Sequence, residues 1–172
     1  MDGDSARLLE TRLFHVVRRK HRLNDGSLKT REVICHPGAV TIVPMVDNSH
    51  VCLIRNYRLA VEKTLIELPA GTLEPGENPE QTAIRELEEE TGFRTTQLQS
   101  LHSFYLSPGI LDEQMHLFVA TELTAGPARR EPGEQIENHI VSWPAAMEMV
   151  HDGTIQDAKT LVGLLLYERL RR

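Results

Sequence analysis

The chain has 172 residues, of which 40% are hydrophobic and 26% charged, a balance that is typical of one folded domain and argues against a disordered protein. Its formal net charge of −6 disfavours general binding to nucleic acid, which needs a basic surface. The N-terminus lacks the apolar segment of a signal peptide, and no apolar run approaches the roughly 20 residues that span a membrane, so we expect a cytoplasmic protein with no nucleic-acid or membrane partner.

The N-terminal part of the chain is predicted to form β-structure. Residues 24–26 (NDG) are a strong hairpin signal, because Asp-Gly supports a tight turn. They separate two β-rich stretches, Leu13–Leu23 and Leu28–His36. Apolar and β-branched residues then predict three more strands, at Ala39–Val46, Val51–Tyr57 and Leu65–Leu68.

A helix is predicted next, with Asn78 as the N-cap, Pro79 in the first turn and Gly92 as the stop. The remaining segments are expected to be the strands Leu98–Leu106, Met115–Ala120 and His139–Ser142, a polar loop at Thr124–Gly133, and the helices Pro144–Asp152 and Asp157–Arg171. Because strands and helices do not alternate regularly, the predicted fold class is α+β.

One long motif spans the predicted helix and the loop before it, GTLEPGENPEQTAIRELEEETGF at residues 71–93. Gly71 is followed six positions later by Glu77, and Arg85 comes eight positions after that. The segment matches the pattern Gx5Ex7REUxEExGU, where U is a bulky apolar residue, at every fixed position, and therefore closely resembles the Nudix family. The resemblance implies an α/β/α sandwich around a mixed sheet, with a small N-terminal β-region, and a metal-dependent pyrophosphohydrolase.

The residues of this motif support the same chemistry by themselves. Residues three and four apart share a helix face, so Glu86, Glu89 and Glu90 are expected to point the same way, while Ile84 and Leu87 anchor the helix to a core. Three neighbouring carboxylates repel one another unless cations lie between them. Hard oxygen ligands suit Mg²⁺, or Mn²⁺ as a substitute, so the motif predicts a divalent-metal site.

The resemblance also assigns roles. It implies metal binding by the glutamates 86, 89 and 90 and by the backbone carbonyl of Ala70, with Glu89 also counted as catalytic. A glutamate on a later loop commonly assists the attacking water, and we favour Glu134 for this role over Glu131 and Glu137. Arg85 is interpreted as an ion-pairing residue that holds acidic neighbours, and Glu77 as a support for the loop.

A second segment, SPGILDE at residues 107–113, resembles the ADP-ribose pyrophosphatases and related nucleoside diphosphate sugar hydrolases. It implies that the substrate is ADP-ribose, cut to AMP and ribose 5-phosphate. A hydrolase of other nucleoside diphosphate sugars, such as GDP-mannose or ADP-glucose, is the alternative. A non-catalytic nucleotide-sensing domain is a further alternative, which the intact motif disfavours.

The same resemblance names substrate-binding residues and an assembly. Arg31 and Arg58 match positions at which relatives use arginine near phosphates, and Gly109 and Glu113 belong to the SPG segment. Glu113 could contact the substrate's sugar hydroxyls or simply structure its loop. A surface charge on a strand is an equally good interpretation of Arg31. Residues 1–38 are expected to form an N-terminal β-region that makes a homodimer, in which Arg31 could serve the partner's site, and residues 39–172 to form the hydrolase domain.

Overall fold

The computed structural model describes residues 6–130, 132–133 and 135–171. In chain order its elements are β1 (Ala6–Glu10), β2 (His15–Arg22), β3 (Leu28–Cys35), β4 (Ala39–Pro44), β5 (His50–Arg58), β6 (Lys63–Glu67), β7 (Ala70–Thr72), α1 (Pro79–Glu86), the π-helical turn η1 (Leu87–Thr91), β8 (Phe93–Arg94), β9 (Gln97–Tyr105), β10 (Gln114–Thr121), β11 (Thr124–Ala125), β12 (Ile136–Ser142), α2 (Trp143–His151) and α3 (Ala158–Leu170). None of the described helices is long and apolar enough to cross a membrane.

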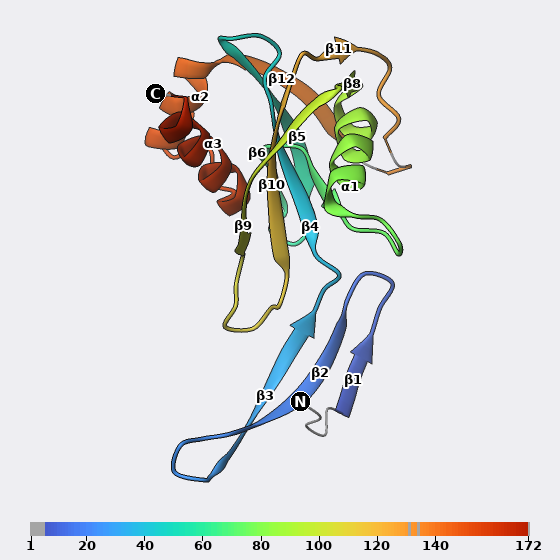
Figure 1. Cartoon of the computed structure of the whole chain (residues 1–172), viewed down its shortest axis with the longest axis vertical. Helices are drawn as coiled ribbons and strands as arrows, with labels where there is room; N and C mark the ends of the chain where they lie inside the picture. Colours follow the sequence, from blue (N-terminus) through green and yellow to red (C-terminus); the bar gives the residue numbers. More distant parts are fainter. Residues whose placement is uncertain (1–5, 131, 134, 172) are drawn as a thin grey trace.

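The N-terminal strands form a sheet of their own. β1, β2 and β3 pair antiparallel in that order, and Figure 1 shows this sheet projecting from the rest of the molecule. The predicted hairpin at residues 24–26 is confirmed, with Gly26 at a φ of 84°. β1 was not predicted. Its residues are all exposed, so it has no buried face to leave a periodic pattern in the sequence.

The main body is an α/β/α sandwich. Strands β4 and β10 run parallel at the centre of a sheet in the order β7-β4-β10-β9, and β12, β5 and β6 form a second, antiparallel sheet. Figure 1 shows α1 on one side of the strands and α2 and α3 on the other. This arrangement confirms the predicted α+β class and mixed sheet.

Two buried clusters fill the layers of the sandwich. On one side, Val40 and Ile42 of β4 pack with Ala83 and Leu87 of the motif helix. On the other side, Val43 of β4 belongs to the cluster that contains residues of α2 and α3. Because successive side chains of a strand point to opposite faces, one apolar strand can serve both layers.

The motif helix begins and ends as predicted but is wound differently at its end. The side chain of Asn78 accepts from the backbone N of Gln81, whose own side chain accepts from the backbone N of Asn78, a capping box. Gly92 ends the helix with a φ of 78°. Between them the α-helix gives way to the π-turn η1, which carries Glu89 and Glu90. Such turns are frequent at functional sites.

Ile84 corrects one expectation about this helix. Its side chain is 45% exposed, whereas Ala83 and Leu87 are fully buried. Ile84 lies one residue beyond the buried position 83, and it is therefore turned away from the sheet. Smaller differences are that β12 begins at Ile136 instead of His139, and that the short strands β7, β8 and β11 were not predicted. Elements of two or three residues are defined by their partners and leave no pattern in the sequence.

Candidate active site

The acidic face of the motif helix lines a cavity of about 680 Å³. Residues from five parts of the chain meet there: Arg12 and Leu13 between β1 and β2, Pro37 between β3 and β4, Asn56 and Arg58 of β5, residues 70–75 and 77 around β7, and Arg85, Glu86, Glu89 and Glu90 of the motif helix. The structure thus brings together the predicted metal ligands Ala70, Glu86, Glu89 and Glu90 and the predicted phosphate ligand Arg58.

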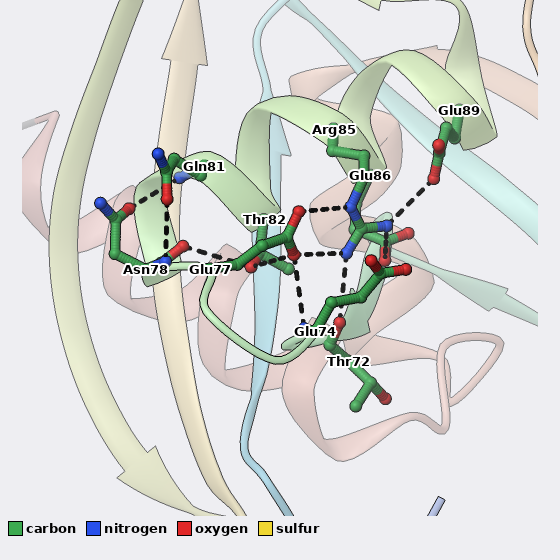
Figure 2. Close-up of polar contacts among 9 residues, drawn as sticks. All are labelled: Thr72, Glu74, Glu77, Asn78, Gln81, Thr82, Arg85, Glu86 and Glu89. Atoms are coloured by element: carbon green, nitrogen blue, oxygen red, sulfur yellow. Dashed lines mark hydrogen bonds and ion pairs between the residues drawn. The ribbon is translucent and has the colours of Figure 1, made fainter. Parts of the chain in front are cut away.

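Arg85 organises the carboxylates on this face (Figure 2). Its Nε and Nη2 donate to the two carboxylate oxygens of Glu77 at 2.9 Å each. Its Nη1 donates to Glu86 at 2.7 Å and to Glu89 at 3.0 Å, and Nη2 also reaches the carbonyl of Thr72 at 3.2 Å. The predicted ion-pairing role of Arg85 is confirmed, and one guanidinium offsets the repulsion among three acids.

Glu77 holds the loop in front of the helix. Besides Arg85, its carboxylate accepts from the hydroxyl of Thr82 at 2.9 Å and from the backbone N of Glu74 at 3.3 Å. The hydrogen bond from Arg85 is the main cause that lowers the pKa of Glu77 to about 2. The carboxylate is therefore ionised at neutral pH and fixed by both ends of the loop, as the interpretation of Glu77 as a loop support predicted.

Glu90 and Gly71 show how closely β7 approaches the motif helix. The Glu90 side chain is buried and its Oε2 accepts from the backbone N of Ala70 at 2.9 Å. A Cβ on Gly71 would lie 1.9 Å from the carboxyl group of Glu86. With the Glu86 carboxyl group in this position, only glycine fits at residue 71, which is a physical reason for the first fixed residue of the motif.

The donors on this wall fit a hard divalent cation. Three carboxylates and a backbone segment supply only oxygen ligands, which is the set that Mg²⁺ and Mn²⁺ prefer. Within the described residues, no three His, Cys, Asp or Glu side chains are drawn together as a ready-made metal group. Glu86 and Glu89 are directed to Arg85 instead, so metal binding would require their oxygens to turn toward the ion.

Arg58 reaches the cavity from a buried ion-pair network that the sequence did not predict. Its Nε and Nη2 donate to Glu67 at 2.9 and 2.7 Å, and Lys159 donates to the same carboxylate at 2.6 Å. Lys159 also pairs with Asp157 at 2.9 Å. Burial opposes ionisation of Glu67, but the hydrogen bond from Arg58 and the charge of Lys159 outweigh it and lower its pKa. The sequence did contain one sign of this network, since Glu67 is the single acid in the apolar segment LIELPA at residues 65–70.

Three expected substrate residues lie away from this cavity. Arg31 is exposed on β3, where it faces Arg19 of β2. Gly109 lies between β9 and β10, in a loop whose Ile110 carbonyl accepts from the backbone N of Ile34 at 2.8 Å. Glu113 is mostly buried, with its Oε1 3.6 Å from Nδ1 of His36. Within one chain, the structure does not bring these three residues to the carboxylate wall.

The predicted catalytic residue Glu134, and Glu131, lie outside the described residues. The described residues on either side are attached to the motif helix. The backbone N of Arg129 donates to the carbonyl of Glu89 at 2.9 Å. Nε of Arg130 donates to the carbonyl of Glu90 at 3.0 Å, and Nδ2 of Asn138 to that of Thr91 at 2.7 Å. Glu137 is exposed at the start of β12.

Comparisons with known proteins agree with this geometry. Residues 36–162 match the NUDIX domain family. The chain is 41% identical over 140 residues to an ADP-ribose pyrophosphatase of Bacillus subtilis, covering 80% of this chain and 76% of that protein. It is 36% identical over 164 residues to a GDP-mannose pyrophosphatase of Cronobacter sakazakii, covering 86% and 85%. The crystal structure of an ADP compounds hydrolase superposes with a TM-score of 0.85 at 26% identity, covering 97% of this chain and 91% of that one.

Proposed function

The chain belongs to the NUDIX family of pyrophosphohydrolases, and on that premise we propose that it hydrolyses ADP-ribose to AMP and ribose 5-phosphate. The observation that carries the proposal is the meeting of one arginine, Arg58, with Glu86, Glu89 and Glu90 in a single cavity. Acids can hold a cation and an arginine can hold a phosphate, and hydrolysis of a diphosphate needs both.

Nudix hydrolases generally need a divalent metal, and we assign Mg²⁺ here, with Mn²⁺ as a substitute. The ligands would be the carboxylates of Glu86, Glu89 and Glu90 and the backbone carbonyl of Ala70. The metal would supply charge neutralisation of the diphosphate and activation of a water molecule. With a cation present, Arg85 keeps Glu77 as its two-oxygen partner, so Glu86 and Glu89 can turn without leaving the guanidinium unpaired.

Side chains of the protein are assigned separate roles in the hydrolysis. A water attacks one phosphorus, the bond from that phosphorus to the bridging oxygen breaks, and the bridging oxygen leaves on the other phosphate. Glu89 and Glu134 are the proposed groups that orient the water and accept its proton. Arg58 stabilises the charge that develops on the phosphate oxygens, because Glu67 engages only two of its five N–H donors.

We also propose that the protein is a cytoplasmic homodimer. Residues 1–38 would form the dimerisation element and residues 39–172 the hydrolase domain. The N-terminal β-region exposes several large apolar side chains on its strands and their connections, namely Leu8, Leu9, Leu13, Leu23 and Leu28, which a partner could cover. In such a dimer Arg31 would bind substrate phosphate in the partner's site, Glu113 would contact the substrate's sugar, and Gly109 would bind the substrate as well. The two cysteines are both free and buried, as is usual in a reducing compartment.

A second candidate is a hydrolase of other nucleoside diphosphate sugars. The resemblance to a GDP-mannose pyrophosphatase over most of both chains favours it. The same acids and the same arginine would perform the reaction, because the diphosphate is common to both substrate classes. Only the contacts with the base and the sugar would differ.

A phosphatase-coupled assay tests both candidates. ADP-ribose, GDP-mannose, ADP-glucose, UDP-glucose, NADH and a diadenosine polyphosphate are offered with and without Mg²⁺, and phosphate released from the products is measured. A strong preference for ADP-ribose supports the first proposal, and broad cleavage of diphosphate sugars supports the second. If folded protein releases no phosphate from any compound of the panel, both proposals are overturned.

A further inference from the structure

The buried pair of Glu67 and Lys159 takes no part in the proposed chemistry, yet it is built against a residue that does. Glu67 is fully buried and Lys159 is 7% exposed, and neither side chain lines the active-site cavity. Two ionised groups in the interior are costly unless each is paired. Among the described residues, Arg58 is the one cavity-lining side chain that hydrogen-bonds to this pair, and it shares the carboxylate of Glu67 with Lys159.

The three side chains come from two neighbouring strands and a helix that is distant in the chain. Arg58 ends β5, Glu67 ends the neighbouring strand β6, and Lys159 lies in the first turn of α3. Nη2 of Arg58 and Nζ of Lys159 both donate to Oε2 of Glu67, at 2.7 and 2.6 Å. Nε of Arg58 donates to Oε1 of Glu67 at 2.9 Å. The guanidinium is thereby fixed in direction by two parallel hydrogen bonds.

The start of α3 is also hydrogen-bonded to the short connection between β6 and β7. Asp157 caps α3 by accepting from the backbone N of Thr160 at 3.0 Å and pairs with Lys159 through its other oxygen. The hydroxyl of Thr160 donates to Asp157 at 2.6 Å and accepts from the backbone N of Leu68 at 2.8 Å. The segment DAKT at residues 157–160 thus holds both Glu67 and the backbone that leads to Ala70.

The charge of Lys159 also affects how strongly Arg58 can attract an anion. Along the network they alternate, with Arg58 positive, Glu67 negative, Lys159 positive and Asp157 negative. If Lys159 were absent, the whole charge of Glu67 would act on Arg58 and weaken its attraction for an anion in the cavity. With Lys159 present, that negative charge is divided between two cations.

We propose that Lys159 and Glu67 are positioning residues that hold the guanidinium of Arg58 toward a substrate phosphate, with the N-terminus of α3 as their support. This inference rests on the proposed function, in which Arg58 binds phosphate. In this proposal Lys159 and Glu67 act on the substrate through Arg58, and so the effect of these two side chains must vanish when Arg58 is removed.

A double-mutant cycle tests that dependence. Lys159→Met is expected to lower kcat/KM for ADP-ribose about tenfold in the wild-type background and by less than about twofold in the Arg58→Ala background. Equal losses in both backgrounds would overturn the proposal, because a general loss of structure does not depend on Arg58. Arg169→Met, which removes an exposed cation near the other end of α3, is the matched control and should leave kcat/KM unchanged.

A binding measurement separates this proposal from the choice of substrate. The equilibrium affinity for inorganic pyrophosphate, measured by calorimetry, should fall with Lys159→Met only when Arg58 is present. If the wild-type enzyme leaves ADP-ribose intact, the proposed function fails, whereas the pyrophosphate cycle still decides the positioning role. Should Lys159→Met not fold, Glu67→Gln, which keeps the shape of the side chain, replaces it in both cycles. Additive losses for that variant would equally overturn the proposal.

Discussion

Arg85 and Glu77 face each other across eight residues of chain through two parallel hydrogen bonds of 2.9 Å, from Nε to one carboxylate oxygen and from Nη2 to the other. The pair closes the loop of the motif onto the motif helix (Figure 2). It also leaves the Nη1 side of the guanidinium directed at Glu86 and Glu89. Loop closure and the spacing of two proposed metal ligands therefore depend on one side chain.

Glu77→Gln should make the protein less stable at pH 7 and flatten its acid sensitivity. The pKa of Glu77 is lowered from 4.5 to about 2, chiefly by the hydrogen bond from Arg85. A carboxylate with a lowered pKa in the folded state contributes stability above pH of about 4.5, and this is lost as the pH falls toward about 2. Urea unfolding at pH 7, 5 and 3 measures the effect, with the exposed Glu80→Gln as control. A parallel decline in wild type and Glu77→Gln would contradict it.

Arg85→Lys should lower kcat about tenfold or more, which corresponds to about 1.4 kcal/mol, although the charge is kept. An ammonium donates from a single atom and cannot reach Glu77, Glu86, Glu89 and the carbonyl of Thr72 together, as the guanidinium does. Steady-state kinetics and thermal unfolding are the measurements. Arg94→Lys, at the exposed arginine of an ion pair with Glu88, is the matched control and should change neither. Wild-type kcat in Arg85→Lys would show that the two-pronged geometry is dispensable.

Gly71→Ala should reduce turnover more than it reduces stability. The new Cβ would meet the carboxyl group of Glu86 at 1.9 Å, and this group is the end of a flexible side chain that can move aside. We expect kcat to fall about tenfold or more, while the free energy of unfolding changes by about 1 kcal/mol. Kinetics across a Mg²⁺ titration, together with urea unfolding, separate the two effects. A variant that unfolds while its residual activity stays normal would refute this account.

Glu90→Gln should nearly abolish turnover, by about a hundredfold or more, and leave the fold intact. Glu90 is buried and accepts a hydrogen bond from the backbone N of Ala70, and the amide oxygen of glutamine can accept the same bond. What is lost is the negative charge that a cation needs. Circular dichroism checks the fold, and turnover at rising Mg²⁺ checks the metal. Persisting activity would mean that Glu90 is not a metal ligand.

Much of the active-site wall could be predicted from the sequence, because its geometry is local. The N-cap at Asn78, the stop at Gly92 and the ion pairing of Arg85 with acidic neighbours all involve residues within one loop and one helix. For such residues, helical spacing decides which side chains share a face. The exposure of Ile84 marks the limit of this reasoning, since which apolar side chain is buried depends on the sheet that the helix meets.

The sequence by itself therefore determined the reaction class, the acidic helix and the α+β character of this protein. Only the tertiary structure decided that Glu67 lies between Arg58 and Lys159, although Lys159 follows Glu67 by 92 residues in the chain. It also decided that Gly71 of β7 lies so close to Glu86 that a Cβ there would meet the carboxyl group. It also decided that Arg31, Gly109 and Glu113 lie away from the carboxylate wall of their own chain. The physical reason is that periodicity encodes neighbours along one element, whereas contacts between elements depend on how strands pair and layers pack, which no local pattern records.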